Sequence, residues 1–352
     1  MEDKRFFELD ALRGFAALFV MFFHFTEGKT NLHFFNLGVT AVDLFFMISG
    51  FVIFMSINKV SSGKEFIINR ISRLYPTYWT CVTITYLVML FLVKANFHFT
   101  HVNIPGFKEY LANMTMFQYY LKVPNLDSPY WTMIIEMLFY LFILLLFQLK
   151  LLKRITEIGC AINIIIILNY LLVVNKSVTN FTIYFPLLNH FALFFAGITF
   201  YKITHHLQSK LYGYCVILFC IATQIIIFKS TGSDPAHIIL VQYLFALIIY
   251  TILFTLFINE KLKFIVSRPT IFLGNISFAL YLIHSFIFRG LIGYLVTRFH
   301  LNFWVITIFI ATPLVILMAF FITNYIEKPY GKKMKNYLNN FLKPSMSPSI
   351  NK

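Results

Sequence analysis

The segment LDALRGFAALFVMFFHF, residues 9–25, carries ionisable side chains inside an apolar run. Arg13 and His24 are 11 residues apart, so on an α-helix they lie about 20° from each other and about 16 Å apart along the axis. Asp10, one turn before Arg13, could pair with its guanidinium. Ionisable groups are costly in an apolar helix and are therefore candidates for function. The alternative is a salt-bridged anchor at one end and an interfacial histidine at the other.

Two further apolar segments each carry a carboxylate. VDLFFMISGF places Asp43 six residues before Ser49, and YWTMIIEMLFYL places Glu136 five residues after Trp131 and one turn before Tyr140. A carboxylate at such a position could orient a histidine or hold a substrate hydroxyl. Asp43 could instead cap its helix, and Glu136 could make a purely structural bond to an arginine or a tyrosine.

Basic and aromatic polar residues complete the candidate set. FIINRISRLYPTYW places Arg70 and Arg73 three residues apart, so both can face one ligand, and paired guanidiniums suit phosphate groups. Ordinary positive charge at a membrane surface is the alternative. Tyr281 and His284 are also three residues apart, in ISFALYLIHSFIFRG. His190 has no obvious companion and stays outside the candidate set.

The composition shows what kind of protein must position these residues. Of the 352 residues, 59% are hydrophobic and 12% are charged, and the mean hydropathy is +0.76. Soluble domains carry roughly 25% charged residues, so a water-soluble fold is excluded and an all-α polytopic membrane protein is predicted. The net charge of +15 lies in short loops between apolar runs. It therefore favours membrane orientation over a nucleic-acid partner.

Ten apolar segments approach the roughly 20 residues that a membrane-spanning helix needs. They lie near 8–26, 36–57, 74–93, 131–149, 156–175, 184–203, 211–229, 236–258, 271–297 and 302–324. With the N-terminus inside, the inner segments hold 20 lysines and arginines and the outer segments hold 7. This asymmetry predicts that both termini are cytoplasmic. The bias towards Ile, Phe, Asn and Lys favours a bacterial source and hence the bacterial plasma membrane.

The chain is expected to form one membrane domain over 1–335, followed by a mobile cytoplasmic tail over 336–352. No cleavable signal peptide is expected. The connection between Lys94 and Tyr130 is the only long outer one, and it could either cover an external substrate site or act as a structured spacer. The four cysteines show no CxxC or Cys/His spacing, so no metal site is expected.

Depth in the membrane separates the candidates into two groups. Three of them lie in the outer half: His24, Asp43 and Glu136. Arg70 and Arg73 lie at the inner face, with Arg13 towards the same side and His284 between the groups. A polar path would then join an inner phosphate-binding end to an outer acid–base cluster. Acyl-coenzyme A, with its charged head and long thin reactive arm, has a matching shape.

These stretches resemble the acyltransferase-3 family of integral membrane acyltransferases. The matching motifs are LDALRGFAALFVMFFHF with its Arg-x10-His spacing, VDLFFMISGF, RISRLYP, YWTMIIEMLFY, ISFALYLIH and YIEKPYGK. They occur in family order over residues 9 to about 333. One departure is Trp131-Thr132-Met133, where the family usually has Trp-Ser-Leu.

The resemblance implies an enzyme of about ten membrane helices that uses cytoplasmic acyl-CoA, often acetyl-CoA. Such enzymes acylate hydroxyls of cell-surface or lipid-linked glycans such as O-antigen or exopolysaccharide. The resemblance also implies that Arg13 and His24 are essential, that Arg70 and Arg73 handle acyl-CoA, and that Glu136 is the acidic residue after the tryptophan.

The expected mechanism is a transmembrane O-acyl transfer, and the acyl group is expected to be acetyl. His24 would act as general base on the acceptor hydroxyl, and Glu136 or Asp43 would orient it. Arg13 would guide the donor. Supporting roles are expected for Trp131, Tyr140, Tyr281, His284 and Ser49. An acyl-histidine intermediate remains open. The alternatives are a glycan or lipid transporter that uses the buried acids and histidine as a proton relay, and a non-catalytic membrane scaffold.

Overall fold

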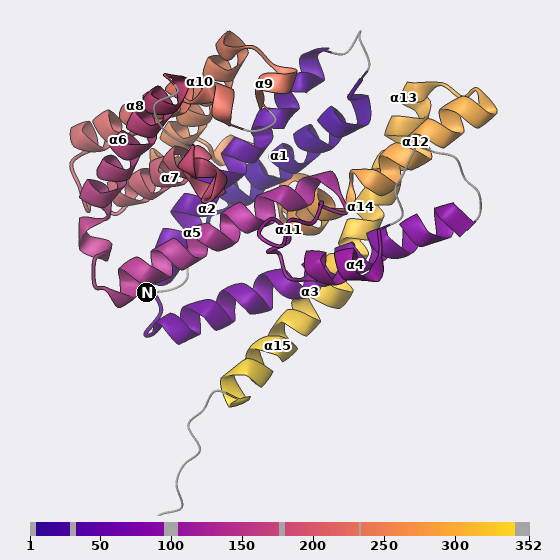
Figure 1. The fold of residues 1–352 in the computed structure, drawn as a ribbon, viewed down its shortest axis with the longest axis horizontal. Coiled ribbons are helices and arrows are strands. Elements are labelled where there is room, and N and C mark those ends of the chain that lie inside the picture. The colour runs from indigo at the N-terminus through magenta and orange to yellow at the C-terminus, as the bar shows by residue number, and fades with distance from the viewer. Residues whose placement is uncertain (1–4, 29–32, 95–104, 176–179, 232–233, 342–352) are drawn as a thin grey trace, which may run out of the picture.

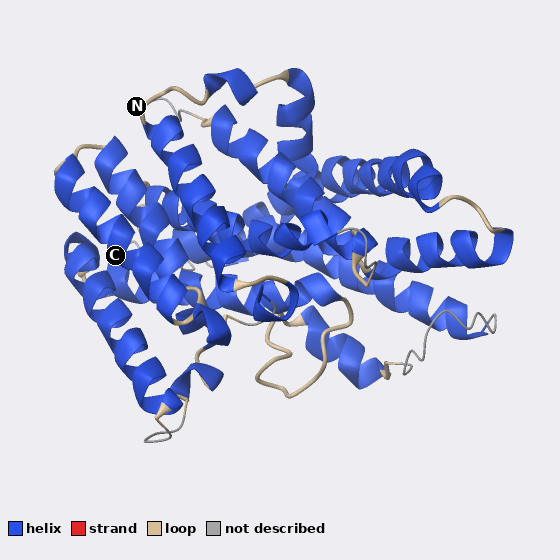
Figure 2. Cartoon of the chain, turned by 90° about the horizontal axis from the view of Figure 1, so that it is seen from above, coloured by secondary structure: helices blue, strands red, loops and turns tan. Residues whose placement is uncertain are grey.

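The computed structural model of the protein describes residues 5–28, 33–94, 105–175, 180–231 and 234–341 (Figure 1). Within these ranges the chain is helical with loops and contains no strand, which confirms the all-α prediction for the part described (Figure 2). Helices suit a lipid environment because each satisfies its own backbone hydrogen bonds.

Seven helices of the described chain are long and apolar enough to cross a membrane. They are α1 (Phe7–Thr26), α2 (Ala41–Ile57, extended by a 3-10 turn before it), α3 (Gly63–Lys94), α5 (Trp131–Gln148), α6 (Ile155–Val174), α10 (Leu240–Ile258) and a helical run from Phe303 to Phe341. Between these segments of the sequence lie α4 (Phe107–Met114), α7 (Phe191–Thr204), α8 (Lys210–Ile226) and α9 (Asp234–His237). The protein is therefore multi-pass, while the count of ten spans and the cytoplasmic termini stay predictions.

One predicted span is broken. In place of a single helix over 271–297, α11 (Arg268–Ile283) and α12 (Phe286–Phe299) meet at an angle of 75°. The carboxylate of Asp127, far away in the sequence, accepts the backbone N–H of Phe286 and so replaces a hydrogen bond that a continuous helix would make. The break therefore depends on a tertiary contact.

Two helices are longer than expected. α3 begins at Gly63, eleven residues before the predicted start, so Arg70 and Arg73 lie on its body. The run from Phe303 contains α13 (Phe303–Ile306), α14 (Thr312–Phe321) and α15 (Lys328–Phe341), joined by π-helical segments. α15 packs beside α3 and extends away from the bundle (Figure 1). The first residues of the expected tail are thus helical, and 342–352 lie outside the described residues.

Close backbone contact between α1 and α11 sets the position of the first helix. A Cβ atom on Gly274 would lie 2.1 Å from the carbonyl oxygen of Asp10, and one on Gly14 would lie 2.8 Å from Cβ of Leu273. Small residues permit such approaches between membrane helices. This contact brings Arg13 beside the polar residues of α11.

Candidate active site

A cavity of about 100 Å³ lies in the middle of the bundle, between α1, α2, α3, α5, α11 and the π-helical segment before α15. Six predicted site residues line it: Arg13, Ser49, Arg73, Glu136, Tyr140 and Tyr281. These side chains come from five helices spread over most of the sequence. The structure therefore brings together six of the eleven candidates.

The cavity wall carries charges of both signs. Arg13 lies within electrostatic range of Arg73 and Glu136. Asp10, which could pair with Arg13, lies within electrostatic range of it and also accepts a hydrogen bond from Nε of Arg5 at 2.6 Å. Arg13 and Arg73 both line the cavity, so the two arginines can act on one bound group.

Hydrogen bonds to two neighbours fix the carboxylate of Glu136. Oγ of Ser49 donates to its Oε1 at 3.2 Å, and the hydroxyl of Tyr140 makes a short hydrogen bond to the same oxygen. The structural Glu–Tyr bond weighed as an alternative is thus present. Because these bonds hold the carboxylate at the wall, Glu136 can also place a defined negative charge beside a ligand.

Sequence reasoning missed a second acid in the cavity, Glu327. It ends the π-helical segment Ile322–Glu327, accepts a hydrogen bond from Oγ1 of Thr77 at 3.4 Å, and lies within electrostatic range of Arg73. Its only signal in the sequence was its place in the YIEKPYGK motif, because nothing at helical spacing identified a partner.

Arg70 lies behind the cavity wall. Its Nη2 donates to Oγ of Ser56 at 3.1 Å, and its guanidinium carbon lies 5.9 Å from the ring centroid of Tyr140. The two arginines of the Arg-x-x-Arg motif therefore point to different surroundings, although they share one face of α3. Arg73 reaches the cavity, whereas the role of Arg70 in donor binding stays a prediction.

Aromatic side chains continue from the cavity towards His24. The hydroxyl of Tyr281 shares a hydrogen bond with Oγ1 of Thr132 at 3.1 Å, and its ring centroid lies 5.9 Å from that of His284. The ring of His284 in turn lies 5.1 Å from the ring of His24. The rings of Tyr281 and His284 thus lie between the cavity and the histidine near the end of α1.

The carboxylate that the structure places beside His24 is Glu27, whereas we expected Glu136 or Asp43. Nδ1 of His24 lies 3.5 Å from Oε2 of Glu27, and Nη1 of Arg289 lies 2.7 Å from the same oxygen. The interaction with His24 lowers the pKa of Glu27, and the charge of Arg289 adds to this effect. Glu136 cannot orient His24 in this way, because its hydrogen bonds to Ser49 and Tyr140 hold it at the cavity wall.

Glu27 follows His24 by three residues, which is helical spacing, so the sequence carried a signal for this pair.

Asp43 belongs to a separate group with His190. Nδ1 of His190 lies 3.9 Å from Oδ1 of Asp43. The ring of Trp131 lies 5.4 Å from the ring of His190. His190 had been left outside the candidates, and both Asp43 and Trp131 lie outside the cavity lining.

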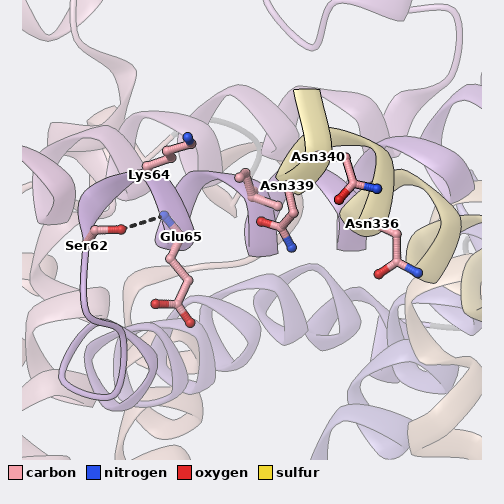
Figure 3. Close-up of a pocket in the computed structure, with 7 residues that line it drawn as sticks. Ser62, Lys64, Glu65, Asn336, Asn339 and Asn340 are labelled. Carbon is pink, nitrogen blue, oxygen red and sulfur yellow. Dashed lines mark hydrogen bonds between the residues drawn. The ribbon is translucent and has the colours of Figure 1, made fainter. Parts of the chain in front are cut away.

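A larger hollow of about 570 Å³ lies outside the predicted site, where α3 begins and α15 ends (Figure 3). Its wall is polar, with Ser62, Lys64, Glu65, Asn336, Asn339 and Asn340. Oγ of Ser62 accepts the backbone N–H of Glu65 at 3.2 Å, which satisfies a donor in the first turn of α3. Lys64 and the three amides thus give this hollow a mostly polar lining.

Within the described ranges, no group of three or more His, Cys, Asp or Glu side chains could hold a metal ion.

Comparisons with known proteins agree on the type of chemistry. Residues 6–324 match the acyltransferase-3 family, which is described as an acyltransferase domain. A putative acetyltransferase, ORF330, of Acidianus two-tailed virus is 25% identical over 78% of this chain and 80% of its own. The acyltransferase MdmB of Streptomyces mycarofaciens is 28% identical over 38% of this chain and 37% of its own.

The exopolysaccharide production protein ExoZ of Rhizobium meliloti is 43% identical, over 17% of this chain and 18% of its own. No solved structure matches the chain.

Proposed function

Because the chain belongs to the acyltransferase-3 family, and is thus a multi-pass membrane enzyme that transfers acyl groups, we propose that it moves an acetyl group from cytoplasmic acetyl-CoA to a hydroxyl of a cell-surface or lipid-linked glycan. The observation that carries the proposal is the run of contacts from the cavity through Tyr281 and His284 to His24. These contacts lead from a cavity lined by two arginines and two glutamates to a histidine that could act as a base.

The donor is proposed to enter the cavity with its reactive end. Drug-sized ligands occupy roughly 300–1,000 Å³, so a cavity of about 100 Å³ admits a thin arm but no nucleotide. An acetyl thioester on an extended chain has this shape. Arg13 and Arg73 would hold the arm of the donor as it passes through the cavity towards His24, while Glu136 and Glu327 limit the net charge of the site.

The nucleotide end of the donor then has to lie outside the cavity. The polar hollow at the start of α3 has a volume of about 570 Å³, and Lys64 with the amides of α15 suits phosphate and base edges. Both sites are lined by residues of α3: the hollow by Lys64 and Glu65 in its first turn, and the cavity by Arg73 further along the helix. One extended donor could therefore follow this helix from the hollow to the cavity.

At the acceptor end, His24 is proposed as the general base. The carboxylate of Glu27 would hold Nδ1–H, which leaves the lone pair on Nε2 to accept a proton from the acceptor hydroxyl. The hydroxyl oxygen then bonds to the thioester carbonyl carbon, the C–S bond breaks, and coenzyme A leaves as a thiolate that takes up the proton. The sum is an ester and a free thiol.

A glycan acceptor is proposed because one relative is named as an exopolysaccharide production protein and the family resemblance implies sugar hydroxyls. The excess of lysine and arginine in alternate segments supports cytoplasmic termini, with His24 on the outer side. The bacterial plasma membrane is the proposed location.

The test combines purified protein in lipid nanodiscs, radiolabelled acetyl-CoA, and surface glycan prepared from cells that lack the protein. We expect label in a base-labile ester on the glycan with wild-type protein and none with His24→Ala. Label in neither reaction, at equal amounts of folded protein, contradicts the proposal. Net movement of unmodified glycan across vesicles would indicate a transporter instead.

A further inference from the structure

The break between α11 and α12 fixes the tautomer of a buried histidine, His284. His284 is the residue that follows α11, and its Nδ1 lies 2.8 Å from the carbonyl oxygen of Tyr281 and 3.2 Å from that of Leu280. The last carbonyls of a helix lack N–H partners of their own. A carbonyl only accepts hydrogen bonds, so Nδ1 must carry the hydrogen, and the neutral ring presents a lone pair on Nε2.

That second nitrogen is buried and makes no hydrogen bond to any described residue. The side chain of His284 is 0% exposed. Leaving a buried acceptor unsatisfied costs about 1–3 kcal/mol, so such a group calls for a functional explanation. The ring of His24 lies 5.1 Å away, on the side of the acceptor, and Tyr281 lies on the side of the cavity.

A buried carboxylate holds the break in place. Both oxygens of Asp127 lie 3.1 Å from the backbone nitrogen of Phe286, the first residue of α12, and Oδ1 also accepts the N–H of Ser128 at 2.7 Å. Asp127 is only 3% exposed. It therefore connects the segment before α5 to the start of α12 and fixes where α11 ends.

We propose that His284 is a proton-relay residue of the transfer reaction, and that Asp127 is a positioning residue that keeps His284 in its relay tautomer. The proposal rests on the function proposed above. His24 removes the proton of the acceptor hydroxyl and passes it to Nε2 of His284, whose Nδ1–H stays on the two carbonyls. His284 then gives the proton to the departing thiolate of coenzyme A, which lies beside the acceptor oxygen that has taken the acetyl group.

Several groups act on the charge of His284. Burial and the nearby His24 and Arg289 disfavour a positive charge on the ring, so a proton that it receives is readily passed on to the thiolate. The ring of Tyr281 lies 5.9 Å away, and Asp127 lies across the break. The carbonyls of Leu280 and Tyr281 stabilise the ring when it carries a positive charge. No proton is gained or lost overall, because the hydroxyl supplies the one that the thiolate consumes.

Asparagine separates the two roles of His284. In His284→Asn the amide keeps an N–H where Nδ1 lies and can still donate to the carbonyls, but it has no atom that accepts a proton. His205 is a matched control, because its Nδ1 makes the same kind of contact to the carbonyl oxygen of Tyr201 at 3.1 Å on a different helix end. His205→Asn therefore removes a similar ring without touching the relay.

The measurement is the rate of acetyl transfer to glycan by nanodisc protein, with folded protein quantified by size-exclusion chromatography. We expect His284→Asn to lose about 100-fold or more, the scale of acid–base catalysis, and His205→Asn to match wild type. Wild-type-like transfer by His284→Asn overturns the relay while leaving the proposed function intact. Absence of transfer by wild-type protein itself overturns both.

A second pair of variants tests Asp127 through rescue. Asp127→Asn keeps an oxygen that accepts the N–H of Phe286, whereas Asp127→Ala removes it. We expect kcat to fall at least 10-fold in Asp127→Ala with an unchanged KM for acetyl-CoA, since a displacement of about 1 Å can cost about 100-fold, and we expect Asp127→Asn to recover most of the rate. Equal rates for the alanine variant and wild type overturn the positioning role.

Discussion

His24 and His284 lie with their ring centroids 5.1 Å apart, although they come from opposite ends of the sequence. Nδ1 of His24 lies 3.5 Å from the carboxylate of Glu27, and Nδ1 of His284 lies 2.8 Å from the carbonyl oxygen of Tyr281. We propose that Nε2 of each ring carries the transferred proton. The predictions below test this pair and the elements that position it.

Glu27→Gln tests the partner of His24. The amide can accept a hydrogen bond but cannot stabilise the imidazolium, so we expect the transfer rate to fall about 100-fold, less than the roughly 10,000-fold effect of the corresponding change in serine proteases.

His24 and Arg289 both lower the pKa of Glu27. The ion pair should therefore persist as the pH falls through the ordinary value of 4.5 and be lost only below it.

The matched variant is Glu136→Gln, which changes the carboxylate that we first expected beside His24. It should leave the slope of the pH–rate profile between pH 5 and 7 unchanged. If Glu27→Gln transfers acetyl groups as fast as wild type while Glu136→Gln alters that slope, the assignment of Glu27 fails.

Arg73→Gln and Arg70→Gln test which arginine meets the donor. Only Arg73 lines the cavity, so its loss should raise the KM for acetyl-CoA about 10-fold or more by removing charge-assisted hydrogen bonds. Arg70 packs against Tyr140 and bonds to Ser56, so Arg70→Gln should affect the yield of folded protein more than KM. Steady-state kinetics with both variants measures the two KM values for acetyl-CoA. A higher KM for Arg70→Gln than for Arg73→Gln would refute the assignment of Arg73 to the donor.

Gly274→Ala tests the contact that sets the position of α1. The new Cβ atom would lie 2.1 Å from the carbonyl oxygen of Asp10, so α1 and α11 must move apart. We expect a loss of about 1–3 kcal/mol in stability, as for other overpacked sites, together with reduced transfer because Arg13 moves. Gly293→Ala is the control, since a Cβ atom there meets nothing within 4 Å. Thermal unfolding that affects both variants equally would contradict the prediction.

The pH dependence of stability tests Asp127. Burial raises the pKa of Asp127 to about 7, from an ordinary value of 3.8. The fold therefore favours the protonated form, and the contribution of this residue to stability falls as the pH rises from about 4 to about 7. Asp127→Asn, which does not titrate, should gain in Tm relative to wild type between pH 5 and pH 8. A constant difference in Tm over that range would contradict the shift.

Residue type and spacing predicted part of the cavity lining. Arg13 and Glu136 were chosen because ionisable groups are costly inside apolar helices, and Arg73 because of its spacing from Arg70; all three line the cavity. The Arg-x10-His spacing also placed His24 beyond the cavity on the same helix face as Arg13, and the ring of His284 lies between His24 and Tyr281. These features are local, because helical periodicity determines which residues share a face.

Tertiary contacts explain what the sequence could not predict. The link His284-Ser285 between α11 and α12 contains neither proline nor glycine, so nothing local marked the bend, which depends on Asp127. Glu327 reaches the cavity only because α15 and the segment before it pack on α3. Helix packing of this kind is invisible to periodicity.

The central claim is that His24 takes the proton of the acceptor hydroxyl in an acetyl transfer across the membrane. Its most direct test is the ester-linked acetate on the surface glycan of cells that carry wild-type protein or His24→Ala at equal membrane abundance. The account predicts acetate with wild type and the level of cells lacking the protein with His24→Ala. Equal acetate in both strains would contradict it.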